Sequence, residues 1–141
     1  KDFEASFPHQ LSGGMRKRVA LAQTFINGPK MLLMDEPFSA LDVQTREMMQ
    51  DELLSLWGQH QGAVLFVTHD LDEAVLMADK VAVLTARPAR VKSLYPIDLP
   101  RPRHVGELRY DRHFIDIARQ IADDLRVEVL KARATSAENR E

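Results

Sequence analysis

The stretch Met31-Leu32-Leu33-Met34-Asp35-Glu36 decides the fold class of this chain. Four apolar residues followed by two acids are typical of a strand that is buried on both faces and ends at solvent. In an open α/β sheet, ligands bind beyond the carboxyl ends of the strands. An acid there can hold Mg²⁺, largely through water, and a second can orient a water molecule for attack on a γ-phosphate. Asp35 is therefore a candidate metal ligand and Glu36 a candidate catalytic carboxylate; a strand that merely ends in solvated acids is the alternative.

Upstream, Ser12-Gly13-Gly14 precedes a helical stretch predicted over residues 15 to about 27, which Gly28-Pro29 ends. Glycines let the backbone approach a ligand closely, and a helix N-terminus offers unpaired N–H groups and a partial positive charge. With the Ser12 hydroxyl as one more donor, the segment suits a polyphosphate. A glycine-containing turn with a serine cap is the plainer interpretation.

Downstream, apolar spacing predicts a helix over residues 43 to about 57, with Asp42 placed to cap it, and a second buried strand over residues 63–68. His69 follows that strand directly. A neutral imidazole there could hydrogen-bond a γ-phosphate oxygen or the attacking water. For Asp42 a helix cap is a sufficient explanation of the residue by itself. For His69 the alternative is a structural or solvated histidine.

The rest of the chain continues this alternation and then changes character. A short helix is predicted over residues 71–78, with Asp70 and Glu73 as a capping pair, followed by strands over 80–85 and 91–97, the latter at an edge. Residues 1–98 thus predict an α/β sheet with crossover helices. A Pro/Arg-rich extended connector over 99–110, an amphipathic helix over 111–133 and a disordered tail over 134–141 complete the expected organisation.

Composition limits the class of protein. Nineteen basic residues oppose 21 acidic ones, which gives no electrostatic reason to expect nucleic acid or an anionic membrane as a partner. Cysteine is absent, so disulfides and thiolate metal sites are excluded. The apolar run at 63–67 is far shorter than the roughly 20 residues of a membrane helix. The chain opens at Lys1 within a polar stretch, which we interpret as a truncated N-terminus.

The candidate segments occur in one order along the chain, and in that order the sequence resembles the ATP-binding subunits of ABC transporters. Residues 11–14 resemble the signature, 31–36 the Walker B strand, 39–42 the D-loop, and His69 the switch histidine. The resemblance covers residues 8 to about 103. It implies a P-loop NTPase-like ABC cassette, of which this chain is the C-terminal half, with a mainly parallel sheet, flanking helices and a C-terminal helical extension.

The resemblance also implies roles and partners. In that family two ATP-binding subunits meet head to tail and enclose two ATP molecules, each bound with Mg²⁺. Carried over by position, Asp35 supports Mg²⁺, Glu36 polarises the attacking water, and His69 bridges the γ-phosphate to the partner. Asp42 links the two sites across the interface. The segment that approaches the partner's nucleotide comprises Gln10, Ser12, Gly13 and Gly14.

One family feature is absent from these 141 residues: no Gly-x-x-x-x-Gly-Lys-Ser/Thr P-loop occurs. Its backbone N–H groups and lysine hold the β- and γ-phosphates. We therefore expect the isolated chain to bind ATP weakly or not at all and to be inactive. We also expect missing strands to leave an open sheet edge and an uncovered face, and the isolated chain to be marginally stable.

The segments 87–90 and 97–103, rich in Arg and Pro, resemble importer subunits for nitrate, sulfonate, taurine and related small anions; an unremarkable basic connector is the alternative. The resemblance implies permease subunits and, indirectly, a substrate-binding protein as partners, at the cytoplasmic face of a bacterial-type cell membrane. Two other interpretations stay open: a soluble ABC ATPase acting on ribosomes or DNA, and a truncated remnant that acts only by pairing with other subunits.

Overall fold

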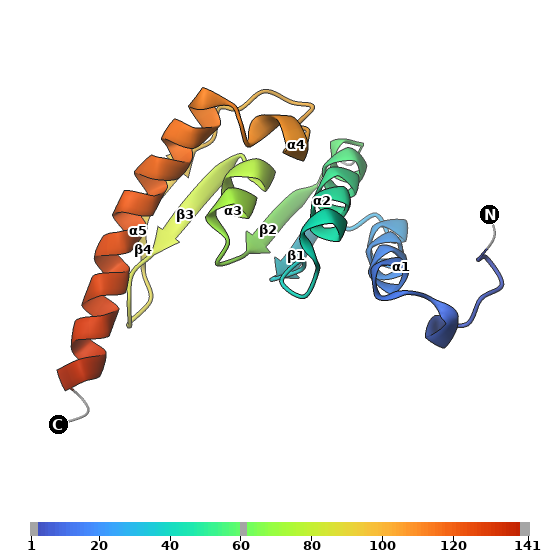
Figure 1. Cartoon of the computed structure of the whole chain (residues 1–141), viewed down its shortest axis with the longest axis horizontal. Helices are drawn as coiled ribbons and strands as arrows, with labels where there is room; N and C mark the ends of the chain where they lie inside the picture. The colour runs from blue at the N-terminus through green and yellow to red at the C-terminus, as the bar shows by residue number, and fades with distance from the viewer. Residues whose placement is uncertain (1–2, 60–61, 139–141) are drawn as a thin grey trace. The chain divides into compact units, whose positions relative to one another are not determined.

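The computed structural model describes residues 3–59 and 62–138 (Figure 1). Its contacts divide the chain into two compact units, the first ending at Val67 and the second beginning at Thr68. In chain order the elements are η1 (Pro8–Gln10), α1 (Gly13–Ile26), β1 (Met31–Asp35), α2 (Val43–Gly58), β2 (Ala63–Val67), α3 (Leu71–Met77), β3 (Lys80–Leu84), β4 (Val91–Pro96), α4 (Val105–Leu108) and α5 (Arg112–Glu138). No helix in the described part of the chain is long and apolar enough to cross a membrane.

The first unit is built on a parallel pair of strands. Strands β1 and β2 pair in register, with Leu33 opposite Leu65. Parallel neighbours need a crossover connection, and α2 supplies it. Asp35 pairs with Val67 at the end of the ladder, so both strands finish at the same edge of the sheet. The predicted crossover arrangement is confirmed here.

Burial of β1 differs from the prediction of a strand covered on both faces, but it agrees with the expectation of an uncovered face on this sheet. Leu32 and Met34 are buried, but Met31 and Leu33 are 62% and 68% exposed. Leu65 and Val67 of β2 are exposed as well. These four side chains, which we call the open sheet face, have no cover among the described residues of this unit. The physical reason is that a continuous apolar run reports how hydrophobic a strand is, whereas burial depends on what packs against each face.

The core of the first unit gathers on the other side, around α2. Met49 and Leu53 are almost fully buried, as their spacing predicted, and Phe38 packs against Phe66 with ring centroids 5.9 Å apart. Gly62, just before β2, is required by space. A Cβ there would lie 3.0 Å from the carbonyl oxygens of Pro29 and Lys30 and 3.2 Å from Trp57.

The second unit combines an antiparallel hairpin with helices. Strands β3 and β4 pair with Ala82 opposite Leu94 and a register shift between Val83 and Leu84. The mainly parallel sheet therefore holds for β1 and β2, whereas β4 returns antiparallel because a short connection joins it to β3. Helix α5 runs along the hairpin and contacts β3 and α3 (Figure 1).

The C-terminal segments depart from the predicted boundaries. The connector expected to be extended contains the short helix α4, which buries Val105. The amphipathic helix continues to Glu138, past its expected end and into the tail predicted to be disordered, because Ala and Glu favour helix and no Gly or Pro intervenes. Residues 139–141 of that tail lie outside the described residues. The division between units also falls after Val67 and not near residue 98, since α5 packs on α3 and β3.

A polar network fixes α5 against β4. The ammonium of Lys92 lies 2.8 Å from the Asp124 carboxylate and 3.1 Å from that of Glu128. Ser93 and Tyr95 donate their hydroxyl hydrogens to Asp124 at 2.6 and 3.0 Å. Hydrogen bonds, chiefly from Lys92, lower the pKa of Asp124 to about 2. Those from Lys131 and then Lys92 lower the pKa of Glu128 to about 2.

Candidate functional site

The predicted signature segment forms the start of α1. Helix α1 begins at Gly13, two residues earlier than predicted, so both glycines lie in its first turn. The Ser12 side chain caps it and accepts a hydrogen bond from the Met15 N–H at 3.2 Å. Accepting uses a lone pair, so the hydroxyl hydrogen can still be donated to a ligand. Gln10 lies in the preceding turn η1, where its side-chain oxygen accepts from the Phe7 N–H at 2.8 Å.

The start of α1 lies beside the start of α2. A Cβ built on Gly14 would sit 3.4 Å from the Cγ2 of Thr45. Asp42 caps α2 and accepts a hydrogen bond from the Thr45 N–H at 3.0 Å, which confirms its predicted capping role. That hydrogen bond lowers the pKa of the Asp42 carboxyl below its ordinary value. Two capped helix N-termini, each with a partial positive charge, thus meet in the first unit.

Asp35 and Glu36 come where β1 ends. Asp35 is the last residue of the strand and its side chain is exposed. Glu36 has a backbone φ of 47°, in the left-handed region, and its N–H donates to the carbonyl oxygen of Val67 at 2.9 Å. Such a conformation costs a non-glycine residue about 1–3 kcal/mol, and the following proline favours extended backbone instead. The surrounding turn must therefore hold Glu36 in place.

Three contacts close that turn. Ser39 donates to the Glu36 carbonyl from its N–H at 3.3 Å and from its hydroxyl at 3.0 Å. Phe38 is buried, which anchors the middle of the turn in the core. The ammonium of Lys17, on α1, donates to the carbonyl oxygen of Pro37 at 2.9 Å. Sequence reasoning missed Lys17, because nothing in the basic run from Arg16 to Arg18 distinguishes it.

His69 belongs to the second unit, where it lies between two residues, Thr68 and Asp70, that are hydrogen-bonded to each other. The Asp70 N–H donates to the Thr68 hydroxyl oxygen at 2.9 Å, and that hydroxyl donates to the Glu73 carboxylate at 2.9 Å. Asp70 in turn accepts from the N–H groups of Asp72 and Glu73 at 3.0 and 3.2 Å. Asp70 is thus confirmed as the cap of α3. The Glu73 side chain, 3% exposed, reaches Thr68, a residue that the predicted capping pair did not include.

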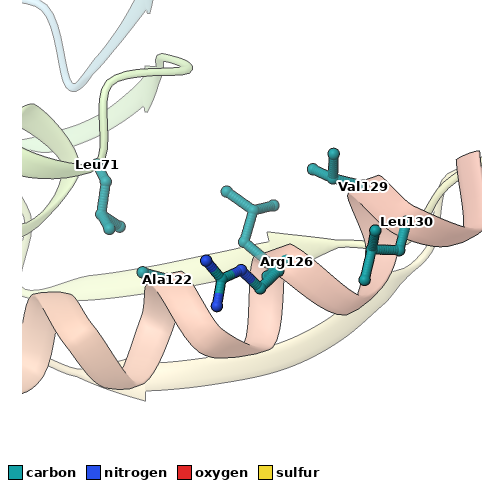
Figure 2. Close-up of a pocket in the computed structure, with 6 residues that line it drawn as sticks. Leu71, Ala122, Arg126, Val129 and Leu130 are labelled. Atoms are coloured by element: carbon teal, nitrogen blue, oxygen red, sulfur yellow. The ribbon is translucent and has the colours of Figure 1, made fainter. Parts of the chain in front are cut away.

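A shallow apolar hollow of about 350 Å³ lies on α5 near the start of α3 (Figure 2). Its lining carries no acid, histidine or hydroxyl: Leu71, Ala122, Leu125, Arg126, Val129 and Leu130. It therefore offers none of the chemistry of the candidate site.

The metal chemistry available in the described part of the chain is limited. No group of three or more His, Cys, Asp or Glu side chains gathers there to cage an ion. Mg²⁺ usually keeps several waters and takes one or two carboxylates together with substrate phosphates. A single exposed carboxylate at the end of β1 fits that mode of binding and does not fit a cation cage.

Comparisons with known proteins identify sequences similar to this chain. The family model described as ABC transporter matches residues 1–39. An uncharacterised ABC transporter ATP-binding protein of Methanocaldococcus jannaschii is 51% identical over 130 residues, which is 92% of this chain and 47% of that protein. An aliphatic sulfonates import ATP-binding protein of Bacillus licheniformis is 48% identical over 103 residues, 73% of this chain and 40% of that protein.

A solved structure extends the comparison to the fold. It is an ATP-binding cassette in a dimeric post-hydrolysis state bound to ADP and Pi. It is 30% identical to this chain, with a TM-score of 0.54 over 71% of this chain and 42% of that one.

The fold is that of part of an ATP-binding cassette. In sequence the chain matches part of the ATP-binding proteins of ABC transporters. It spans less than half the length of the relatives named above.

Proposed function

We propose that this chain is part of the ATP-hydrolysing subunit of an ABC importer. The observation that carries the proposal is the placement of two consecutive carboxylates at the carboxyl end of β1, with Glu36 held in a left-handed backbone conformation. The same unit contains two capped helix N-termini, those of α1 and α2. Strained backbone that the surroundings enforce is typical of functional sites. The similar proteins named above are ATP-binding proteins, which supports the same assignment.

The proposed roles follow from what each group can do and, for His69 and Asp42, from the family resemblance. The Glu36 carboxylate would accept a hydrogen bond from the attacking water and orient it, and Asp35 would hold Mg²⁺ through water. The metal would neutralise the negative charge of the γ-phosphoryl group of ATP. His69 bridges to the γ-phosphate, while Asp42 links the two sites of a dimer. The segment that faces nucleotide bound by a second subunit comprises Gln10, Ser12, Gly13 and Gly14.

The proposed transport class is import of small anions of the sulfonate, nitrate or taurine type. The relatives named as aliphatic sulfonates import proteins, at 43% and 48% identity, support the sulfonate type. The partners are a second ATP-binding subunit, permease subunits and, indirectly, a substrate-binding protein, at the cytoplasmic face of the membrane. The solved cassette is dimeric, which supports pairing with a second ATP-binding subunit; the head-to-tail arrangement is part of the proposal.

The proposed function requires groups that hold the β- and γ-phosphates of the nucleotide. The chain has no P-loop sequence, and the donors described at the candidate site are the starts of α1 and α2 and a few side chains. We propose that residues 1–141 alone do not bind ATP at micromolar concentrations. Isothermal titration of the chain with Mg²⁺–ATP tests this, and micromolar affinity would contradict it.

The decisive experiment uses a complete cassette, made by joining the N-terminal part of the Bacillus licheniformis relative to this chain. This joined cassette, with Glu36 unchanged and called wild type below, should hydrolyse ATP in the presence of Mg²⁺. Glu36→Gln should abolish hydrolysis and leave ATP binding intact, because the amide keeps the size of the side chain and loses its charge. Glu107→Gln, an exposed acid in the second unit, is the matched control. Normal turnover by Glu36→Gln would exclude Glu36 as the catalytic carboxylate.

A further inference from the structure

Helix α1 makes polar side-chain contacts with other parts of the first unit. Phe25, near its C-terminal end, is its one buried residue among those described. Closer to the start of the helix, Arg18 makes a bidentate ion pair with the Glu52 carboxylate of α2. A second polar contact is the hydrogen bond from Lys17 to the Pro37 carbonyl oxygen. The first turns of α1 hold no fully buried apolar side chain among the described residues, so these polar side chains contribute to the position of the helix.

The acceptor of the Lys17 hydrogen bond lies directly after the proposed catalytic residue. Pro37 follows Glu36, whose left-handed backbone needs support from the turn. The bond from an ammonium to a carbonyl is charge-assisted and therefore stronger than a neutral one. It is also partly buried, which reduces competition from water. Lys17 thus restrains the turn at Pro37, whereas Ser39 and Val67 contact Glu36 itself.

We propose that Lys17 is a positioning residue that couples the signature helix to the turn carrying Glu36. This inference rests on the proposed function. The start of α1 serves nucleotide bound by the partner subunit, whereas Glu36 acts on nucleotide bound by its own subunit. A displacement of α1 moves the ammonium of Lys17, and through it Pro37 and the Glu36 carboxylate. Lys17 therefore connects the state of one nucleotide site to the geometry of the other.

The test compares three variants in the complete cassette. Lys17→Met removes the charge and the donor while keeping much of the apolar stem. Lys17→Arg keeps both the charge and the donor. Lys30→Met removes an exposed lysine of the same unit, outside the site. The quantities measured are kcat, KM for ATP, the Hill coefficient of hydrolysis, and the urea midpoint of unfolding.

Lys17→Met should lower kcat about 10- to 100-fold, the loss produced when a catalytic group is misplaced by about 1 Å, and should lower the Hill coefficient toward one. KM and the urea midpoint should stay close to wild type, and Lys17→Arg should recover most of kcat. The proposal is overturned if Lys17→Met matches Lys30→Met, if Lys17→Arg is as slow as Lys17→Met, or if kcat falls only together with the urea midpoint. A wild-type cassette that hydrolyses no ATP would instead refute the proposed function.

Discussion

Replacing Arg103 by methionine should strongly destabilise the second unit. The Arg103 side chain, in a residue only 4% exposed, donates to the carbonyl oxygens of Leu76 at 3.0 Å and Ala78 at 2.8 Å, at the end of α3. It also donates to Leu99 at 3.1 Å and, more weakly, to Ile97 at 3.5 Å. Carbonyls at a helix C-terminus have no partner within the helix and carry partial negative charge, so the guanidinium satisfies two of them and complements the dipole.

The expected loss can be worked from these contacts. Three hydrogen bonds of normal length to a charged group, at about 1.5–3 kcal/mol each, give roughly 5–9 kcal/mol gross. Part of this only offsets the desolvation of a buried charge that methionine does not require, so the net loss should be about 3–5 kcal/mol. Because whole domains are stable by only about 5–15 kcal/mol, the second unit should unfold at much lower urea concentration.

The assay is urea denaturation of the 141-residue chain followed by circular dichroism. Arg101→Met is the matched control, because the contacts of Arg101 are exposed: an ion pair with Asp79 at 2.8 Å and a hydrogen bond to the Met77 carbonyl oxygen at 3.3 Å. An exposed ion pair contributes about 0–1 kcal/mol. A midpoint for Arg103→Met equal to that of Arg101→Met would refute the argument that buried carbonyl contacts stabilise this unit.

Three further predictions follow from single features. The pKa values of Asp124 and Glu128 lie near 2, below their ordinary values of 3.8 and 4.5. The stabilisation that the two carboxylates provide should therefore be complete above pH 5 and lost as the pH falls toward 2. Urea midpoints measured from pH 6 to pH 2 should show this decline, and the decline should be less steep in Asp124→Asn. Gly62→Ala should lower the urea midpoint because its Cβ would meet two backbone oxygens at 3.0 Å, whereas Gly58→Ala, with open space around it, should raise stability by about 0.5–1 kcal/mol; equal midpoints for the two would show that the tight contacts relax freely. Glu36→Asn should raise the free energy of unfolding by about 1 kcal/mol, because asparagine tolerates left-handed backbone. The same substitution should abolish hydrolysis in the complete cassette. A lower urea midpoint than that of the unchanged chain would mean that Glu36 is not strained.

Local signals predicted the regular elements well. Strand β1 and helix α2 begin at the predicted residues, and Asp42 and Asp70 cap their helices as expected. Capping and apolar spacing are properties of a few neighbouring residues, so one sequence contains them. The same reasoning placed Asp35 and Glu36 at a strand end, and the structure has them there.

Features that depend on distant neighbours could not be predicted in this way. An uncovered sheet face was expected, but that Met31 and Leu33 lie on it depends on which elements cover the sheet. The antiparallel return of β4 depends on the connection after β3. The left-handed backbone of Glu36 results from closure of the turn by two residues. Ser39 lies within the turn, whereas Val67 lies 31 positions downstream of Glu36. Lys17 was missed for the same reason, since its acceptor lies 20 positions away.

The left-handed backbone at Glu36 has a consequence for how such a gene changes by mutation. At this position glycine or asparagine fits the backbone better than glutamate does. A gene copy that is no longer selected for ATP turnover would therefore gain stability by exchanging Glu36, whereas most exchanges in the core around Phe38 and Met49 would lower stability. Drift should remove the carboxylate early and keep the fold, so that loss of catalysis precedes loss of structure.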